Sequence, residues 1–354
     1  MSKTLESIGY SIYFENSLKE LGRFIEKKNY SKIFFLVDRH TATHCLPLVQ
    51  QNLPDLTHFD IIEIEPGEEN KNIDFCIGIW KMLLDFGADR KSLLINLGGG
   101  VVTDMGSFAA STFKRGIDFV QIPTTLLSQV DASVGGKTGI DMDQVKNCIG
   151  TFTQPKAVFI EPEFLKTLDQ RQLISGFAEM IKHGLIADAD YFSALQQINP
   201  MEVSVELIHR SVEIKNEVVI ADPHEHNIRK TLNFGHTIGH AIESHFLETD
   251  SPLLHGEALA MGMLCEAYLS HQIHELDEKA LEEICISLKK IFPLRAISSA
   301  IYPELLAYMQ NDKKNQNGKI GFALLKKIGA CSHNDYISEE KIEESLNFYQ
   351  KTIG

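Results

Sequence analysis

Short apolar runs rich in β-branched and aromatic residues alternate with helix-like segments from the start of the chain to about residue 162. Strands that alternate with helices in this way are typical of a parallel sheet with crossover connections. The pattern therefore predicts an α/β protein whose first domain, residues 1–162, contains a parallel sheet. The predicted strands are 32–38, 61–65, 92–100, 119–123 and 157–162.

Beyond residue 163 the pattern changes to successive helical periods, with apolar residues three and four positions apart. The second domain, residues 163–354, is therefore predicted to be mostly α-helical. The chain contains no repeat of about 20 to 50 residues, which argues against a solenoid. The predicted helices are 170–186, 204–220, 228–246, 255–271, 277–291 and 338–350.

Composition narrows the partners that this chain can have. With 354 residues, 44% of them hydrophobic and 23% charged, it is an ordinary globular sequence that can bury two cores. A net charge of -14 argues against nucleic acid or an anionic membrane as a main partner. Its six cysteines are scattered, and no signal peptide or membrane span is evident, so we expect a cytoplasmic protein with reduced thiols.

A glycine triplet joins a predicted strand to a predicted helix. Gly98, Gly99 and Gly100 follow SLLINL and precede VVTDMGSFAAS. This order predicts a Rossmann-like phosphate cradle, since glycines let an anion approach the N–H groups of a helix start. The motif is imperfect because Thr103 replaces its third glycine, and a tight turn explains the glycines about as well. Asp38, which ends the first predicted strand, suits either ribose hydroxyls or a helix cap.

The segment 123–147 carries an unusual set of polar residues. Asp131, Lys137, Lys146 and Asn147 surround a pair of glycines at 135 and 136. Two lysines and an amide suit a phosphate monoester, whose charge is spread over several oxygens. The alternative is a surface loop with solvated lysines.

Four polar residues in the predicted helix 228–246 share one face. Arg229, Asn233, His236 and His240 lie at i, i+4, i+7 and i+11. Two histidines four residues apart are compatible with a metal or acid/base site, and equally with a solvated helix face.

Two further helices provide residues that change this picture. Taken alone, Glu179 and Lys182 would be an exposed ion pair at i and i+3, and His255 an ordinary neighbour of a helix cap. Taken together, Glu179, His236 and His255 offer one carboxylate and two imidazoles from three helices. That set is the ligand set of a catalytic zinc with an open position for substrate.

The sequence resembles the 3-dehydroquinate synthase family of sugar-phosphate cyclases over nearly its whole length. Several ordered motifs are more specific than any single one. The matching motifs are PGEENK (66–71), GGGVVTDMGSFAAS (98–111), RGIDFVQIPTTLLSQVDASVGGKTGID (115–141), FLKTL (164–168), GFAEMIKHG (176–184), LNFGHTIGHAIE (232–243), LHGEA (254–258) and DKK (312–314).

The resemblance implies two cofactors and a homodimer. Zinc or cobalt would be bound by Glu179, His236 and His255, with His240 facing the substrate, and Arg115 would reach the phosphate site of a neighbouring subunit. The residues implied in NAD binding are Asp38, Glu68, Lys71, Gly99, Gly100, Val101, Asp104, Thr124, Thr125, Lys137, Lys146, Phe164 and Thr167. The residues implied in substrate contacts are Asp131, Lys137, Asn147, Lys182, Lys215, Glu225, Arg229, Asn233, His240 and Lys313 or Lys314.

The chemistry that the resemblance implies starts from 3-deoxy-arabino-heptulosonate 7-phosphate. Transient oxidation of a ring hydroxyl by NAD permits phosphate elimination, and re-reduction, ring opening and an intramolecular aldol step close the carbocycle. The substrate carboxylate would be bound by Lys215 and Arg229. The phosphate would be bound by Lys137, Asn147, Asn233, Arg115 and the lysines of DKK.

Two local departures and three alternatives accompany this resemblance. Val145 stands where the family commonly has glycine, and 167–172 replaces a more usual leucine-proline-x-arginine-glutamate; neither removes a catalytic group. The alternatives are an inosose or valiolone synthase, an iron-dependent alcohol or glycerol dehydrogenase, and a non-catalytic sugar-phosphate-binding regulator. The substrates of inosose and valiolone synthases lack a carboxylate, and the dehydrogenases do not need a lysine-rich phosphate pocket. A non-catalytic regulator would be expected to lose metal ligands.

Overall fold

A computed structural model of the chain describes residues 4–142, 145–247, 249–310 and 319–354. The chain divides into two compact units, Met1–Asp169 and Gln170–Gly354. The first contains a mainly parallel sheet and the second is mostly helical, which confirms the predicted fold class. The first unit extends past residue 162 through the short helix η4 (Pro162–Thr167), because Phe164 packs in its core.

The sheet of the first unit has the strand order β1-β2-β9-β6-β5-β3-β4. In this order each strand from β2 onward is parallel to the next, as predicted. The edge strand β1 pairs antiparallel with β2. That N-terminal hairpin was not predicted, because its strands are too short to show a period. The strands are β1 (Thr4–Glu6), β2 (Ser11–Tyr13), β3 (Ile33–Asp38), β4 (Asp60–Ile64), β5 (Leu93–Gly98), β6 (Asp118–Pro123) and β9 (Ala157–Phe159).

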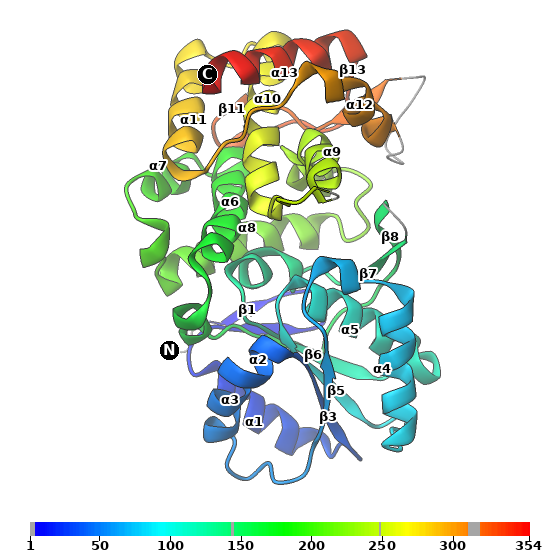
Figure 1. Ribbon diagram of the computed structural model, residues 1–354. Coiled ribbons are helices and arrows are strands. Elements are labelled where there is room, and N and C mark those ends of the chain that lie inside the picture. Colours follow the sequence, from blue (N-terminus) through cyan, green and yellow to red (C-terminus); the bar gives the residue numbers. More distant parts are fainter. Residues whose placement is uncertain (1–3, 143–144, 248, 311–318) are drawn as a thin grey trace. The chain divides into compact units, whose positions relative to one another are not determined.

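Both faces of this sheet are covered by helices, which explains why its strands read as continuous apolar runs. In β3, Phe34 and Leu36 point into a core with α4 and α5, while Phe35 and Val37 point into a core with α1 and α3. Figure 1 shows the two helix pairs on opposite sides of the strands. The helices are α1 (Ser17–Lys28), α2 (Arg39–His44), α3 (Leu46–Asn52), α4 (Ile73–Asp85) and α5 (Gly100–Thr112).

Most of the polar segment 123–147 belongs to a helical turn and a β-hairpin of the first unit. It begins with the π-helical turn η3 (Ser128–Ala132) and continues into the antiparallel hairpin of β7 (Lys137–Met142) and β8 (Val145–Phe152). The described residues of this segment thus form mostly regular structure and not a loop, although Lys137 is exposed as the alternative of solvated lysines requires.

The second unit consists of packed helices with short strands between residues 320 and 337. Among the described residues, no helix is both long and apolar enough to cross a membrane. The helices are α6 (Gln170–Ala187), α7 (Ala189–Gln196), α8 (Val205–Ala221), α9 (His236–Leu247), α10 (His255–His274), α11 (Glu278–Ile291), α12 (Tyr302–Gln310) and α13 (Glu339–Ile353). The strands are β10 (Ile320–Phe322), β11 (Leu325–Lys327), β12 (Ala330–Cys331) and β13 (Asp335–Ile337).

The predicted helix 228–246 is interrupted, so the prediction of one continuous polar stripe is wrong. Residues 228–233 form the 3₁₀ helix η6 (Ile228–Asn233), and α9 begins only at His236. The break lies at Gly235, whose φ of 80° is incompatible with a right-handed helix. Arg229 and Asn233 therefore belong to a different element from His236 and His240.

The helices α9 and α10 approach each other closely at a glycine. A Cβ atom on Gly262 of α10 would lie 2.0 Å from the carbonyl oxygen of Gly235 and 2.6 Å from the nitrogen of Gly239. Since these contacts are to backbone atoms, no side-chain rotation could relieve them. Only glycine allows the start of α9 to rest on α10 at this distance.

We expect Gly262→Ala to lower the free energy of unfolding by about 1–3 kcal/mol, the usual cost of overpacking. Gly78→Ala is the control, because its Cβ in α4 would meet no atom within 4 Å. That variant should gain about 0.5–1 kcal/mol from the loss of glycine in a helix interior. Urea unfolding followed by circular dichroism measures both. Equal stability of Gly262→Ala and the parent would contradict the close contact.

Candidate functional site

The glycine turn of the first unit is built as a tight strand-to-helix connection. Gly98 ends β5, and a Cβ there would lie 2.4 Å from Cβ of Val102. Thr103, which stands in place of a third glycine, donates its hydroxyl to the carbonyls of Gly99 and Gly100 at 3.1 and 3.0 Å. The threonine therefore closes the turn, and the start of α5 keeps N–H groups suited to an anion.

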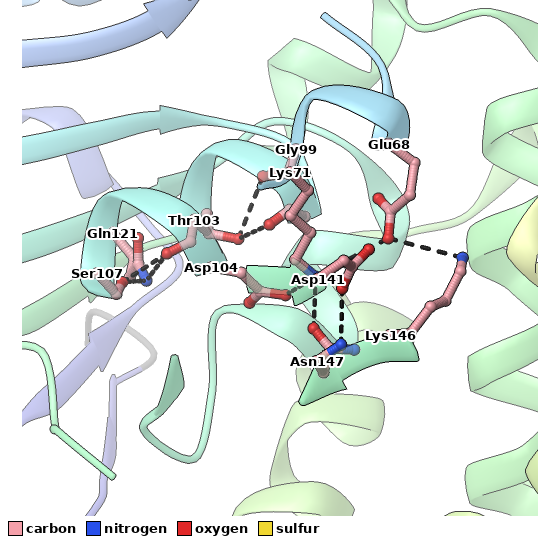
Figure 2. A network of polar contacts seen from close by, with 11 residues as sticks. Glu68, Lys71, Gly99, Thr103, Asp104, Ser107, Gln121, Asp141, Lys146 and Asn147 are labelled. Atoms are coloured by element: carbon pink, nitrogen blue, oxygen red, sulfur yellow. Dashed lines mark hydrogen bonds and ion pairs between the residues drawn. The ribbon is translucent and has the colours of Figure 1, made fainter. Parts of the chain in front are cut away.

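A buried polar network holds α5 against the sheet below this turn. The amide of Gln121 donates to the hydroxyl of Ser107 at 2.6 Å and to the carbonyl of Thr103 at 3.2 Å. The amide of Asn96 in β5 donates to Gln121 at 3.1 Å and to Ser107 at 3.3 Å. Figure 2 shows how this network reaches the glycine turn through Thr103. Neutral hydrogen bonds thus fix the position of the candidate cradle.

A second, charged network lies around Lys71. Its ammonium is 2.7 Å from Asp104 Oδ2 and 2.7 Å from Asn147 Oδ1, and Lys146 is 3.6 Å from Glu68 (Figure 2). Burial opposes ionisation of Lys71, but the carboxylates, Asp104 foremost, outweigh it and raise its pKa. The structure thus brings together five residues that the family resemblance implied: Glu68, Lys71, Asp104, Lys146 and Asn147.

Asp141 supports this network and was not among the predicted site residues. One of its carboxylate oxygens accepts the backbone N–H of Asn147 at 2.6 Å, where Asn147 has a φ of 51°. Its own N–H donates to the carbonyl of Lys71 at 2.8 Å. Burial raises the pKa of Asp141. The residue ends a matched motif, but its role depends on the fold of the hairpin.

The other predicted cofactor residues occupy varied positions in the first unit. The carboxylate of Asp38 accepts the N–H of Thr41 at 2.8 Å and so caps α2. This confirms the helix-cap interpretation of Asp38. The N–H of Thr124 donates to the carbonyl of Gly98 at 3.0 Å, beside the glycine turn. The hydroxyl of Thr125 lies 3.0 Å from that of Ser128.

Three further residues that were predicted to bind the cofactor take part in the packing of this unit. Val101 is partly buried against one core, and the side chain of Phe164 is 2% exposed in the other. The hydroxyl of Thr167 donates to the carbonyl of Phe164 at 3.2 Å.

Three predicted substrate residues also belong to the first unit. Asp131 lies in η3, and Lys137 begins β7 with an exposed side chain. Arg115 is exposed and has a φ of 70°, between Lys114 at 48° and Gly116 at 108°. Consecutive residues with positive φ are strained, which often accompanies function.

The predicted metal ligands converge in the second unit. Glu179 of α6, His236 of α9 and His255 of α10 place one ligand atom each within 4.8 Å of one another. The Nε2 atoms of His236 and His255 lie 3.3 and 3.1 Å from the same oxygen, Oε1 of Glu179. The residues are far apart in sequence, so the helix packing alone assembles them.

The opposite ring nitrogens of both histidines are held by acceptors. His255 Nδ1 donates to Oε2 of Glu243 at 3.2 Å, and His236 Nδ1 donates to the carbonyl of Phe234 at 3.2 Å. This leaves two Nε2 atoms and a carboxylate facing one another, an arrangement that requires protons or a cation between them. Such outer hydrogen bonds orient histidines for a metal. The donor set fits zinc or cobalt.

The charges around Glu179 differ from an exposed ion pair. Lys182 and Glu179 form an ion pair, and both side chains are only 1% exposed. The prediction that this ion pair is exposed is therefore wrong. Burial opposes ionisation of Glu179, but Lys182 and the two neighbouring histidines hold its pKa well below the usual value. Burial likewise opposes a charge on His255, yet Glu243 and Glu179 raise its pKa to about 10. Burial and Lys182 lower the pKa of His236.

His240 lies beside the ligand group, one helical turn after His236. Its ring centroid is 5.0 Å from that of His236 and 5.8 Å from that of His255. One of its ring nitrogens also lies within 4.8 Å of a carboxylate oxygen of Glu243 and a ring nitrogen of His255. The two histidines of the HTIGH motif therefore remain neighbours, although Arg229 and Asn233 do not share their helix.

The remaining predicted substrate residues are buried or paired in the second unit. Arg229 is 2% exposed and donates to the carbonyl of Pro223 at 2.6 Å, which excludes an ion pair at the surface. Asn233 donates to Oε1 of Glu225 at 2.7 Å, and Lys215 of α8 is buried. Lys313 and Lys314 lie outside the described residues.

Four residues that were not predicted as site residues connect the starts of helices α6 and α10: Arg171, Ser175, Gly256 and Glu257. Arg171 donates twice to Glu257, at 2.6 and 2.7 Å, and Glu257 accepts the N–H of Leu254 at 2.9 Å. The N–H of Gly256 donates to the hydroxyl of Ser175 at 2.9 Å. These contacts join α6 to α10 next to Glu179 and His255. The Arg171 contacts lie in the segment that departs from the family pattern.

Known proteins match this chain along its length. Residues 61–175 match the family described as 3-dehydroquinate synthase N-terminal, and residues 176–315 match 3-dehydroquinate synthase C-terminal. The chain is 44% identical to a 3-dehydroquinate synthase of Parabacteroides distasonis, over 95% of this chain and 96% of that protein. It belongs to the 3-dehydroquinate synthase family. A second relative, the 3-dehydroquinate synthase of Thermoanaerobacter pseudethanolicus, is 38% identical over 97% of this chain and 98% of that protein.

Solved structures share the fold of this family member. The 2-epi-5-epi-valiolone synthase of Streptomyces hygroscopicus, solved with NAD+ and Zn2+ bound, is 25% identical with a TM-score of 0.82, over 99% of both chains. A 2-deoxy-scyllo-inosose synthase with carbaglucose-6-phosphate, NAD+ and Co2+ has a TM-score of 0.85 at 22% identity, over 97% of this chain and 99% of that one. The latter likeness shows the fold alone.

We expect His236→Ala to abolish stoichiometric metal binding, because two remaining ligands hold zinc poorly. His245→Ala is the matched control on the same helix, since His245 pairs with Glu304 at 2.9 Å and its ring contacts that of Phe246. Both variants should be loaded with Zn2+, dialysed and assayed for zinc per chain by atomic emission. Full zinc content in His236→Ala would rule out this ligand assignment.

Proposed function

We propose that this chain is a 3-dehydroquinate synthase that converts 3-deoxy-D-arabino-heptulosonate 7-phosphate into 3-dehydroquinate and phosphate. The reaction class would be that of a phosphate-eliminating carbon–oxygen lyase. The observation that carries the proposal is the convergence of Glu179, His236 and His255 in a chain that matches both family regions. A non-catalytic relative would have no reason to keep a complete ligand set.

Two cofactors complete the proposal. Glu179, His236 and His255 would hold zinc or cobalt, and the glycine turn with Lys71, Asp104 and their neighbours would hold NAD. When bound, the cation supplies Lewis acidity toward substrate oxygens, and NAD supplies a hydride acceptor whose reduced form returns the hydride. The valiolone synthase with NAD+ and Zn2+ bound supports this pair of cofactors.

The chain's own residues would handle protons and charge around the ligand group. His240 lies next to His236 and Lys182 is paired with Glu179, which supports a contact of both with a substrate oxygen near that group. We assign His240 to holding or moving a substrate proton. We assign Lys182 to stabilising negative charge on oxygen, which a desolvated ammonium does more strongly than one in water.

Separate cations would bind the two ends of the substrate. Lys215 and Arg229 are both buried, so each can interact strongly with a carboxylate. Lys137, Asn147 and Asn233 would contact the phosphate, with Lys313 or Lys314. Asp131 and Glu225 would contact hydroxyls. The strained turn at Arg115 would present its guanidinium to the phosphate site of a second copy, in a homodimer.

The first test separates a cyclase from a dehydrogenase. If NAD is recycled, a catalytic amount of NAD should support many turnovers of the heptulosonate phosphate. Phosphate release and absorbance of NADH should be followed together, with NAD below the enzyme concentration. We expect many phosphates per NAD and no net NADH. NADH accumulating in proportion to product would favour a net dehydrogenase.

The second test separates this activity from the other sugar-phosphate cyclases, whose substrates lack the carboxylate. Arginine grips a carboxylate through two parallel hydrogen bonds, and lysine offers only a point charge. We therefore expect Arg229→Lys to lose about 2 to 4 kcal/mol of transition-state binding, or roughly 30- to 1000-fold in kcat/KM. Its zinc content should stay normal.

The matched control is Arg210→Lys in α8. Arg210 is partly exposed and pairs with Asp188 and Glu213, both at 2.7 Å, so its replacement should change kcat/KM less than twofold. An equally small effect of Arg229→Lys would remove the carboxylate pocket and reopen the choice among sugar phosphates.

A further inference from the structure

A carboxylate is buried in an apolar stretch in the middle of helix α10. Glu266 is 0% exposed and lies among residues such as Met263, Leu264 and Cys265. Its Oε2 accepts the N–H of Gly235 at 2.6 Å, and its Oε1 accepts the N–H of Ile238 at 3.2 Å. A buried carboxylate needs such hydrogen bonds, because without them its burial would cost several kcal/mol.

These two N–H groups are the ones that the two side chains of a capping box satisfy. The first helical bond of α9 runs from the N–H of Gly239 to the carbonyl of Gly235 at 3.0 Å, so Gly235 occupies the cap position. In a capping box, a cap side chain and a side chain three residues later bond the N–H groups at these two positions. Here one carboxylate from another helix bonds both.

Gly235 cannot carry a capping side chain of its own. Its φ is positive, and a Cβ there would lie 2.4 Å from Cγ of Met263 and 2.9 Å from Leu259. One turn before Glu266, Gly262 rests against the carbonyl of Gly235 and the nitrogen of Gly239. The first turn of α9 is thus fixed by α10 at two places, and His236 is the first residue of that turn.

We propose that Glu266 is a positioning residue for the metal ligand His236. It fixes the backbone on both sides of His236, so that Nε2 meets Glu179 before any metal binds. The helix α10 then supplies one ligand directly, His255, and orients a second through Glu266. A carboxylate suits this place because it only accepts hydrogen bonds and because negative charge is favourable at a helix start. The inference rests on the proposed metal centre.

The test compares zinc affinity in the parent, Glu266→Gln and Ser270→Ala. Glutamine keeps the shape but turns an NH2 group toward one of the two N–H donors. Ser270 is the matched control one turn later in α10, where its hydroxyl accepts the N–H of Leu325 at 2.8 Å. Metal-free proteins are titrated with Zn2+ against a chromophoric chelator. Urea unfolding without metal shows how far each variant is destabilised.

We expect Glu266→Gln to weaken zinc binding by about 10- to 100-fold, as losses of residues that orient a ligand do. Its Co2+ form should show shifted visible absorption bands, because the ligand geometry changes. Ser270→Ala should bind zinc within twofold of the parent at comparable destabilisation. Zinc affinity and Co2+ bands in Glu266→Gln that equal those of the parent would overturn the proposal.

A second measurement uses only the parent protein, in case Glu266→Gln does not fold. Hydrogen exchange in the metal-free parent should show the amides of Gly235 and Ile238 protected. If both exchange freely until Zn2+ is added, the metal orders this turn and Glu266 does not. Failure of the metal centre itself gives a different result, since the parent would then bind no stoichiometric zinc.

Discussion

The burial of an ionised carboxylate, Glu179, is the constraint on which the second unit depends. At 1% exposure its charge would be very costly without compensation. Compensation comes from Lys182 on the same helix and from His236 and His255 on two others. Three helices must therefore meet at one oxygen atom. A cation at the same point would add to that compensation, so the arrangement that stabilises the folded carboxylate is also the one that favours metal binding.

The helices can meet there because glycines lie where the helices approach each other. Gly256 follows His255, and a Cβ on it would be 2.0 Å from the carbonyl of Ser175 in α6. Gly262 plays the same part between α10 and the first turn of α9. Side chains larger than hydrogen at these positions would move whole helices apart and separate the ligands by the same amount. These glycines thus set the distances among Glu179, His236 and His255 through helix packing.

Sequence patterns predicted the strands and helices that depend on local periodicity, and they missed the features that depend on tertiary contacts. The buried strands such as β3 and the ligand helices were predictable, because continuous apolar runs and helical spacing depend little on their neighbours. The break before His236 was not, since H-x-x-x-H reads the same whether or not Gly235 interrupts the helix. Glu179 and Lys182 at i and i+3 likewise read the same exposed or buried. Burial is decided by residues that lie far away in the sequence.

The first unit shows two different ways of placing polar groups inside a protein. Below the glycine turn, Asn96, Ser107 and Gln121 form a neutral network that does not change charge with pH and so gives a fixed support. Around Lys71 the groups are charged, and each hydrogen bond is correspondingly strong but dependent on its partner. The neutral network is buried, while the side chain of Asp104 in the charged network is 18% exposed. The uncharged network therefore supplies the rigid support for the glycine turn.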